Sequence, residues 1–283
     1  LTDEDYQKTW MPKLKDPIVR AFWEKEMAKT SDFHKSEMLG YLVSKVGRFV
    51  ENEMMRNIMG QSHSAFDLRD IMDNEKVLLV NLSKGKTGEV NSELLGLIIV
   101  SKIQMAAMGR ADMPESERKD FYLYVDEFQN FATDSFASIL AEARKYRLNL
   151  IVAHQYISQL EEKIRDAVFG NVGTFISFRI GVEDAEIVAK ELDPVFSETD
   201  VINIEKFHAY LRLMTNSRKS PPFTMATYPP PTDGSQEIAE AVRQLSRLKN
   251  GRDKTVVEAE IMERAQLSST PDTDLNAGMG SGR

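Results

Sequence analysis

Two adjacent carboxylates follow an apolar run near the middle of the chain. Residues 121–125 read Phe-Tyr-Leu-Tyr-Val, and Asp126 and Glu127 come directly after them. A short continuous apolar run is typical of a strand buried on both faces of a parallel sheet, and ligands bind at the carboxyl edge of such sheets. In nucleoside triphosphatases the first carboxylate holds Mg²⁺ and the second polarises the attacking water. The alternative is a strand that ends in a solvated acidic turn.

A glutamine follows the next predicted strand. Residues 148–153 are mostly apolar, and His154 and Gln155 come after them. A glutamine at this edge can reach a γ-phosphate or its attacking water and so report nucleotide state, whereas an amide that only caps the edge is the alternative. His154 shares no metal-ligand spacing with the other histidines, so we assign it a structural role.

Arg144 lies near the C-terminal end of a helix predicted at about 134–147. A cation there interacts favourably with the helix dipole, which is a purely structural reason for an arginine. In a ring-shaped ATPase the guanidinium could instead reach a neighbour's γ-phosphate and stabilise charge in the transition state. The sequence leaves both roles open.

The sequence contains no complete phosphate-binding loop of the G-x-x-x-x-G-K-[ST] type. The nearest candidate is Gly85-Lys86-Thr87, but Val80 stands where the first glycine is required. Backbone amides must cradle the phosphates in such a loop, so this chain alone is expected to be inactive as an ATPase. We expect Lys84 and Lys86 to form a basic loop that faces DNA or a partner subunit, or that is simply solvated.

Strands and helices alternate from residue 75 onward. This alternation predicts an α/β fold with a doubly wound, mainly parallel sheet. The expected strands are 77–80, 121–125, 148–153 and 174–179, the expected helices are about 94–105, 134–147, 157–169 and 183–192, and two later strands near 208–214 and 223–228 would pair at the sheet edge.

Helical segments flank the predicted sheet. Residues before it carry apolar side chains at helical spacing, and a charged helix follows Pro229-Pro230-Pro231. The last residues are rich in Ser, Gly and Asp, which is typical of disorder. The predicted domains are a helical segment, 1–74, the sheet-containing core, 75–230, a charged helical extension, 231–267, and a disordered tail, 268–283.

Composition restricts the classes of function. With 36 Lys and Arg against 44 Asp and Glu, the 283 residues carry a net charge of −8, so DNA contact requires a local patch or an assembly. Arg212, Arg218 and Lys219 are scattered candidates. The absence of cysteine excludes thiolate catalysis, disulfides and cysteine-ligated metals. No apolar run is expected to approach the roughly 18 residues that span a bilayer, so we expect a soluble segment.

Three segments resemble the C-terminal half of HerA/FtsK-superfamily ATPases. They are 123–131, 142–148 and 153–160, and they occur in the family's order along the chain. Residues 77–81 also resemble the strand that precedes the Asp-Glu strand in this group. Within the superfamily the chain most resembles the type IV secretion coupling proteins of the conjugative TraG/TraD-like group, over roughly residues 40–228.

This resemblance implies a RecA-like, P-loop NTPase-type domain of a hexameric pump that moves DNA with ATP and Mg²⁺. Asp126 and Glu127 would be the Walker B pair, Gln155 the sensor and Arg144 the arginine finger. The segment 1–74 would be the end of an all-α insertion. DNA in the assembled ring and relaxosome or secretion-channel proteins are the implied partners.

The same resemblance implies that a P-loop strand, and usually a membrane anchor, lie upstream of Leu1. The parent protein would then work in the cytoplasm, at the inner face of the cell membrane. Two other classes of protein stay open. One is a non-catalytic, RecA-like module that binds DNA or protein, which the upstream coding sequence would distinguish. The other is a small-ligand α/β enzyme that uses Asp126 and Glu127 as an acid/base pair in a closed apolar pocket.

Overall fold

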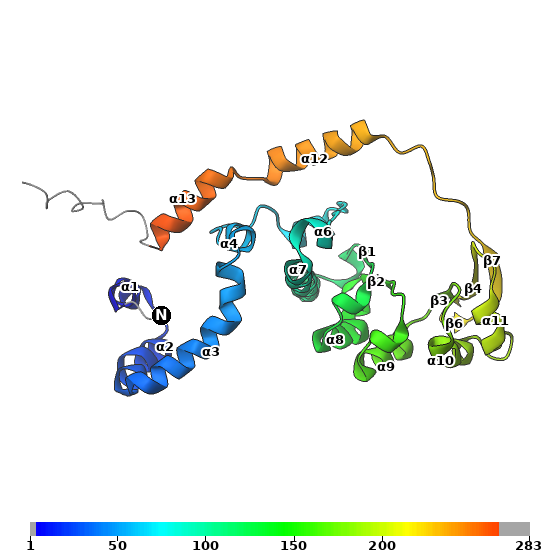
Figure 1. Ribbon diagram of the computed structural model, residues 1–283, viewed down its shortest axis with the longest axis horizontal. Coiled ribbons are helices and arrows are strands. Elements are labelled where there is room, and N and C mark those ends of the chain that lie inside the picture. Colours follow the sequence, from blue (N-terminus) through cyan, green and yellow to red (C-terminus); the bar gives the residue numbers. More distant parts are fainter. Residues whose placement is uncertain (1–3, 266–283) are drawn as a thin grey trace, which may run out of the picture. The chain divides into compact units, whose positions relative to one another are not determined.

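Two compact units make up the part of the chain that the structure describes, residues 4–265. In this computed structural model Ala65–Leu245 forms one, the α/β unit, and the described residues of Leu1–Ser64 and Ser246–Arg283 form the other, the helical unit (Figure 1). The tail predicted to be disordered lies outside the described residues. The predicted domain boundaries stay predictions.

The helical unit confirms the helices expected near the N-terminus. Side chains of Asp16, Ser31, Asn52 and Asp253 accept hydrogen bonds from the first free backbone amides of four helices, which fixes where those helices begin. The elements are α1 (Glu4–Trp10), a 3₁₀ turn (Met11–Lys13), α2 (Pro17–Ala21), a π-helical turn (Phe22–Met27), α3 (Asp32–Val50), α4 (Glu53–Met59) and α13 (Lys254–Arg264).

Helices α4 and α13 pack together although they are far apart in the sequence. Met55 and Val257 are buried. Asn57 Nδ2 donates a hydrogen bond to Glu258 Oε1 at 2.9 Å, across a separation of 201 residues. The N-terminal helices and the C-terminal helix therefore share one small core.

A pair of parallel strands supplies the middle of the α/β unit. Strand β1 (Phe121–Val125) runs beside β2 (Leu148–Val152), with Val125 opposite Val152. Helices α5 (Leu68–Asp73), α7 (Glu89–Gly109), α8 (Asp134–Glu142) and α9 (Glu162–Asn171) complete this part, and Figure 1 shows α8 and α9 beside the strands. The buried core includes Leu68, Ile71, Met72, Ile103, Ala107, Val125, Phe128, Phe136, Ile139, Leu148, Leu160, Ile164 and Val168. The predicted α/β class with parallel strands is confirmed.

The prediction of a strand at 77–80 is wrong. These residues are extended but pair with no strand among the described residues. Val77 and Leu79 are 86% and 83% exposed, and only Leu78 packs against the core. An apolar run becomes a buried strand only where a neighbouring strand and a second layer cover it. Neither covers 77–80 in the described part of the chain.

The strand expected at 174–179 joins a separate antiparallel sheet. Strand β3 (Phe175–Ser177) pairs with β4 (His208–Arg212), which pairs with β7 (Phe223–Ala226). A small ribbon of β5 (Met214–Thr215) and β6 (Arg218–Lys219) lies between β4 and β7 in the sequence. The two later strands thus pair with each other as expected, but β3 joins their free edge. Helices α10 (Val182–Leu192) and α11 (Glu198–Asn203) carry the buried side chains of this part.

Helix α7 is apolar around most of its circumference. The segment Glu89–Asp112 is long and apolar enough to cross a membrane by length and composition, contrary to the sequence-based expectation that no apolar run approaches that length. In the structure Ile103 and Ala107 lie in the core of the α/β unit. A Cβ on Gly96 would lie 2.2 Å from Cε1 of Phe131, so the aromatic ring packs directly on the helix backbone. These contacts cover one part of the helix, since 28% of its apolar window is buried in the described structure.

Short helical segments connect these elements. They are α6 (Lys84–Thr87) and the 3₁₀ turns Arg110–Asp112, Glu115–Glu117, Phe128–Asn130, Ala143–Tyr146 and Ile157–Gln159.

Helix α12 (Gln236–Asn250) has no buried residue, and its apolar side chains Ile238, Val242, Leu245 and Leu248 are exposed. The charged helix expected after the three prolines is therefore present.

Candidate active site

Strands β1 and β2 end side by side, and their main chains stay bonded beyond the last residue pair. Ala153 N donates to Val125 O at 2.9 Å, and Phe128 N donates to Ala153 O at 2.9 Å. The turn after β1 is thus fixed to the end of β2. Residues that follow the two strands are brought to one edge of the sheet, as the sequence predicts.

Glu127 occupies a left-handed backbone conformation in this turn, with φ 50° and ψ 45°. Such a conformation costs a non-glycine residue on the order of 1–3 kcal/mol and persists only where its surroundings determine it. Here Asp126 Oδ1 accepts a hydrogen bond from Glu127 N at 3.0 Å. The next residue, Phe128, is fully buried against Phe136, with ring centroids 4.6 Å apart. The turn is therefore held from both sides.

Both carboxylate oxygens of Glu127 accept hydrogen bonds from side-chain amides. Gln155 Nε2 donates to Oε1 at 2.5 Å, and Gln129 Nε2 donates to Oε2 at 2.7 Å. Gln155 therefore lies beside Glu127, as expected for residues that follow two neighbouring parallel strands. The contact from Gln129 was not predicted. The sequence indicates only that Gln129 comes two residues after Glu127, and the turn between them brings the two side chains together.

Asp126 is exposed, and one of its oxygens is engaged by the backbone of Glu127. Within residues 4–265 no group of three or more histidine, aspartate or glutamate side chains is placed to hold a metal ion. Mg²⁺ commonly takes only one or two protein carboxylates and completes its octahedral shell with water and phosphate oxygens. Asp126 fits that role together with a bound phosphate, and does not form a metal site alone.

Arg144 does not join this cluster. It is exposed in the 3₁₀ turn Ala143–Tyr146, which precedes the start of β2, whereas Gln155 follows its end. The five residues of β2 extend about 16 Å at the usual rise of a strand. Arg144 therefore lies near the amino edge of the strands, opposite the edge that carries Glu127.

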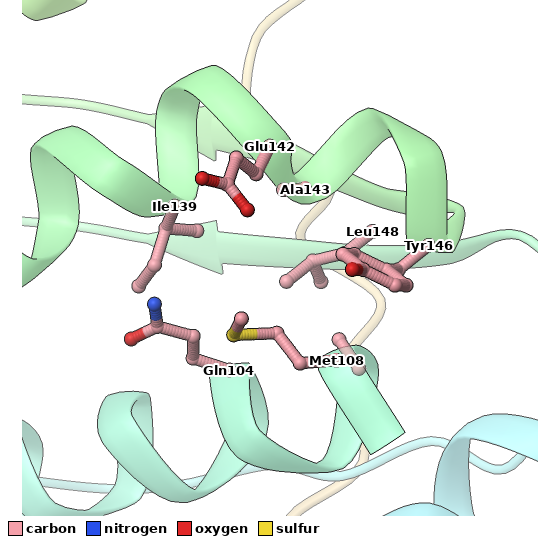
Figure 2. Close-up of a pocket in the computed structure, with 8 residues that line it drawn as sticks. Gln104, Met108, Ile139, Glu142, Ala143, Tyr146 and Leu148 are labelled. Atoms are coloured by element: carbon pink, nitrogen blue, oxygen red, sulfur yellow. The ribbon is translucent and has the colours of Figure 1, made fainter. Parts of the chain in front are cut away.

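A small pocket of about 50 Å³ lies near the same amino edge. Figure 2 shows Gln104 and Met108 of α7 facing Ile139, Tyr146 and Leu148 across it. Leu148 begins β2, so this pocket is at the far end of the strand from the carboxylates. It does not provide the apolar pocket around Asp126 and Glu127 that a small-ligand acid/base enzyme would need.

The basic loop predicted at Lys84 and Lys86 forms helix α6. Lys84 Nζ lies 2.6 Å from Glu89 Oε1 and 3.9 Å from Glu93 Oε1. The hydrogen bond to Glu89 raises the pKa of Lys84 above its usual value, and the negative charges of Glu89, Glu93 and Glu127 add to the effect against a smaller cost of burial. Lys84 is thus within electrostatic range of Glu127, with acidic partners of its own. Lys86 is exposed, and a role of either lysine in DNA binding stays a prediction.

His154, which precedes Gln155 in the chain, lies within electrostatic range of Asp184. Burial lowers the pKa of the half-buried His154, and the charge of Asp184 opposes this shift. Asp184 is only 4% exposed and accepts hydrogen bonds from the backbone of Ile157 and Ser158. Sequence reasoning assigned no role to Asp184, because a contact across 26 residues leaves no periodic signal.

Comparisons with known proteins identify the family of this chain. The family model described as type IV secretory system conjugative DNA transfer matches residues 20–186. A similar solved structure is the bacterial conjugative coupling protein TrwBdeltaN70 in its unbound monoclinic form, with 15% identity and a TM-score of 0.39 over 46% of this chain and 36% of that chain. The chain thus matches about a third of that protein's length, and no curated protein matches it. Because the family match covers more than half of the sequence, this chain belongs to the type IV secretory system conjugative DNA transfer family.

Proposed function

We propose that this chain supplies the hydrolytic residues of a hexameric, ATP-driven DNA translocase, a type IV secretion coupling protein. The observation that carries the proposal is the bonded pair Glu127 and Gln155 beside Asp126, at the carboxyl edge of two parallel strands. Membership of the conjugative DNA transfer family supports a role in DNA transfer. The carboxylates at this edge of the sheet support ATP hydrolysis as the activity.

Asp126 would hold the Mg²⁺ that accompanies ATP, and the bound ion neutralises charge on the phosphates. Glu127 acts as the base that orients the attacking water and accepts its proton. In the structure each of its oxygens accepts one amide hydrogen, from Gln129 and from Gln155, and keeps a further lone pair. Gln155 Nε2 can donate to a phosphate oxygen instead, in an exchange that leaves Oε1 of Glu127 to the water alone. The same exchange lets Gln155 report whether a γ-phosphate is present.

Arg144 acts on the site of a neighbouring copy. Its own chain places it at the opposite edge of the strands, about 16 Å from Glu127's edge by the length of β2. A guanidinium supplied from a neighbour stabilises the charge of a transferring phosphoryl group. With this assignment the site is complete only in an oligomer, and the oligomer we propose is a hexamer.

The phosphates need a cradle of backbone amides that this sequence does not contain. We assign it to a phosphate-binding loop upstream of this chain in the parent polypeptide, together with a membrane anchor that holds the pump at the inner face of the cell membrane. DNA would pass through the assembled ring, with Lys84 and Lys86 as candidate contacts. Relaxosome or secretion-channel proteins would deliver and accept it.

The test uses the full-length polypeptide. Glu127→Gln should abolish ATP hydrolysis and spare ATP binding, because it keeps the shape of the side chain and removes the base. Glu162→Gln is the matched control, since that carboxylate is 83% exposed on α9 and lies 3.7 Å from Arg165. Unchanged turnover in Glu127→Gln would refute the assignment of the base.

The missing phosphate-binding motif favours one other function, a RecA-like module that binds DNA or protein without hydrolysis. The two proposals separate on nucleotide binding by the full-length protein. Tight ATP binding, measured by calorimetry, supports the ATPase. DNA binding without any ATP binding supports the non-catalytic module.

A further inference from the structure

Asp184 is a buried carboxylate that the proposed chemistry does not use. It is the third residue of α10 (Val182–Leu192) and is 4% exposed. A carboxylate that loses its water needs strong hydrogen-bond donors in exchange. The donors of Asp184 therefore indicate what it stabilises.

These donors come from the segment that follows β2. Ile157 N donates to Asp184 Oδ2 at 2.9 Å, and Ser158 N donates to Oδ1 at 3.2 Å. The two amides belong to the first residues of the 3₁₀ turn Ile157–Gln159, which have no partner inside their own turn. Hydrogen bonds to a charged acceptor are about twice as strong as neutral ones, so a single carboxylate holds the start of this turn firmly.

Gln155 lies between two fixed points of the main chain. On one side Ala153 is bonded to β1 through Val125 O and Phe128 N. On the other side Asp184 holds Ile157 and Ser158. Gln155 itself is exposed, and its bond to Glu127 is its one hydrogen bond given by the described residues. The position of its amide therefore depends on the two anchors.

We propose that Asp184 is a positioning residue that sets where the Gln155 amide lies relative to Glu127. The inference rests on the proposed ATPase function and deepens it. It also joins α10, which packs with the antiparallel sheet through Ala185, Val188 and Tyr210, to the nucleotide-reporting amide. A shift of α10 would move the 3₁₀ turn, and with it Gln155.

The experiment measures ATP turnover of the full-length protein in two backgrounds. Asp184→Asn keeps the side-chain shape but removes the charge and one acceptor oxygen. We expect kcat to fall about 10- to 100-fold, with little change in KM for ATP. A loss of this size is typical when a catalytic group is displaced by about 1 Å. In a Gln155→Ala background the same substitution should cost almost nothing more. An equal fold-loss in both backgrounds, or no loss in the first, would overturn the proposal.

Two further variants test whether a loss of kcat comes from the Asp184 hydrogen bonds or from a general disturbance of this region. Glu186→Gln changes an exposed carboxylate on the same helix, whose one ion pair within the described residues is with Lys190, and should leave kcat unchanged. Ser158→Pro removes one of the two donors and leaves Asp184 intact, in a first helical turn where proline is tolerated. It should reduce kcat in the same Gln155-dependent way, and a Gln155-independent loss would count against the proposal.

Amide hydrogen exchange, measured without nucleotide, separates this proposal from the ATPase proposal. Asp184→Asn should speed exchange at Ile157 and Ser158 and leave β1 and β2 protected. Unchanged exchange at both amides would overturn the anchoring role whatever the turnover. Absence of ATP turnover in the wild-type and Glu186→Gln proteins would instead refute the proposed function.

Discussion

Replacing Arg110 with methionine should destabilise the α/β unit by about 3 kcal/mol. The Arg110 side chain is fully buried and bonds three segments. Its Nε donates to Asp73 Oδ1 at 2.9 Å, and its Nη1 donates to the carbonyl oxygens of Lys119 at 2.9 Å and Tyr146 at 3.0 Å. Asp73 ends α5, while the other two residues precede β1 and β2. The guanidinium thus fixes the amino ends of both strands.

The magnitude follows from the burial of the two charged groups. Breaking a buried ion pair by removing one partner costs about 3–5 kcal/mol. Asp73 is 27% exposed and keeps an ion pair with Arg69, so its remaining charge is not stranded. Nη2 of Arg110 is buried and has no hydrogen-bond partner among the described residues, so removing it relieves some desolvation. Both facts place the loss at the low end of the range.

Urea unfolding followed by far-ultraviolet circular dichroism measures this loss. Tryptophan fluorescence is unsuitable, because Trp10 and Trp23 both lie in the helical unit. The midpoint should fall at an unchanged m-value. Arg118→Met, which removes a less buried arginine, should cost clearly less. Combining Arg110→Met with Asp73→Asn should cost less than the sum of the single changes. Strict additivity, or a loss under about 1 kcal/mol for Arg110→Met, would refute the reasoning.

Three further predictions test the site and the core. Gln129→Leu removes one of the two amides on Glu127, and we expect kcat for ATP to fall about 10-fold with ATP binding retained; an unchanged kcat would show that Gln129 does not hold the base. Gly96→Ala places a Cβ against the ring of Phe131 and should cost about 1–3 kcal/mol in chemical denaturation, whereas a neutral effect would mean that the ring moves freely. Arg144→Ala should reduce turnover of the assembled oligomer by about 10³-fold or more, and an equal loss in dilute monomers would argue against action on a neighbour.

The sequence was informative where local pattern and strand direction decide the outcome. Two apolar runs became β1 and β2, and because parallel strands end at one edge, Glu127 and Gln155 were expected to meet there, as they do. The same local rule failed at 77–80, since a run of apolar residues does not say whether a neighbouring strand exists. Pairing direction was equally invisible for β3, whose partner β4 lies about thirty residues away along the chain.

The contacts that sequence reasoning missed are long-range polar ones. Arginine is usually found at the surface of a protein. Arg110 is buried because two carbonyl oxygens and a carboxylate from separate segments accept its hydrogen bonds. In the sequence Asp184 is an acidic residue in the first turn of a predicted helix. Only the folded chain shows that it accepts hydrogen bonds from the amides of Ile157 and Ser158. Neither pairing has a fixed spacing, so no periodicity could have revealed it.

In the proposed ATPase one chain's Glu127 works with a neighbour's Arg144. Mixing full-length Glu127→Gln protein with full-length Arg144→Ala protein and following ATP hydrolysis after assembly tests this pairing. Each variant alone should be nearly inactive. In mixed oligomers an intact Glu127 from one subunit meets an intact Arg144 from the other, so we expect turnover to return as the two are mixed. A mixture that stays as inactive as its components, with mixed assembly verified, would refute the action of Arg144 on a neighbour's site.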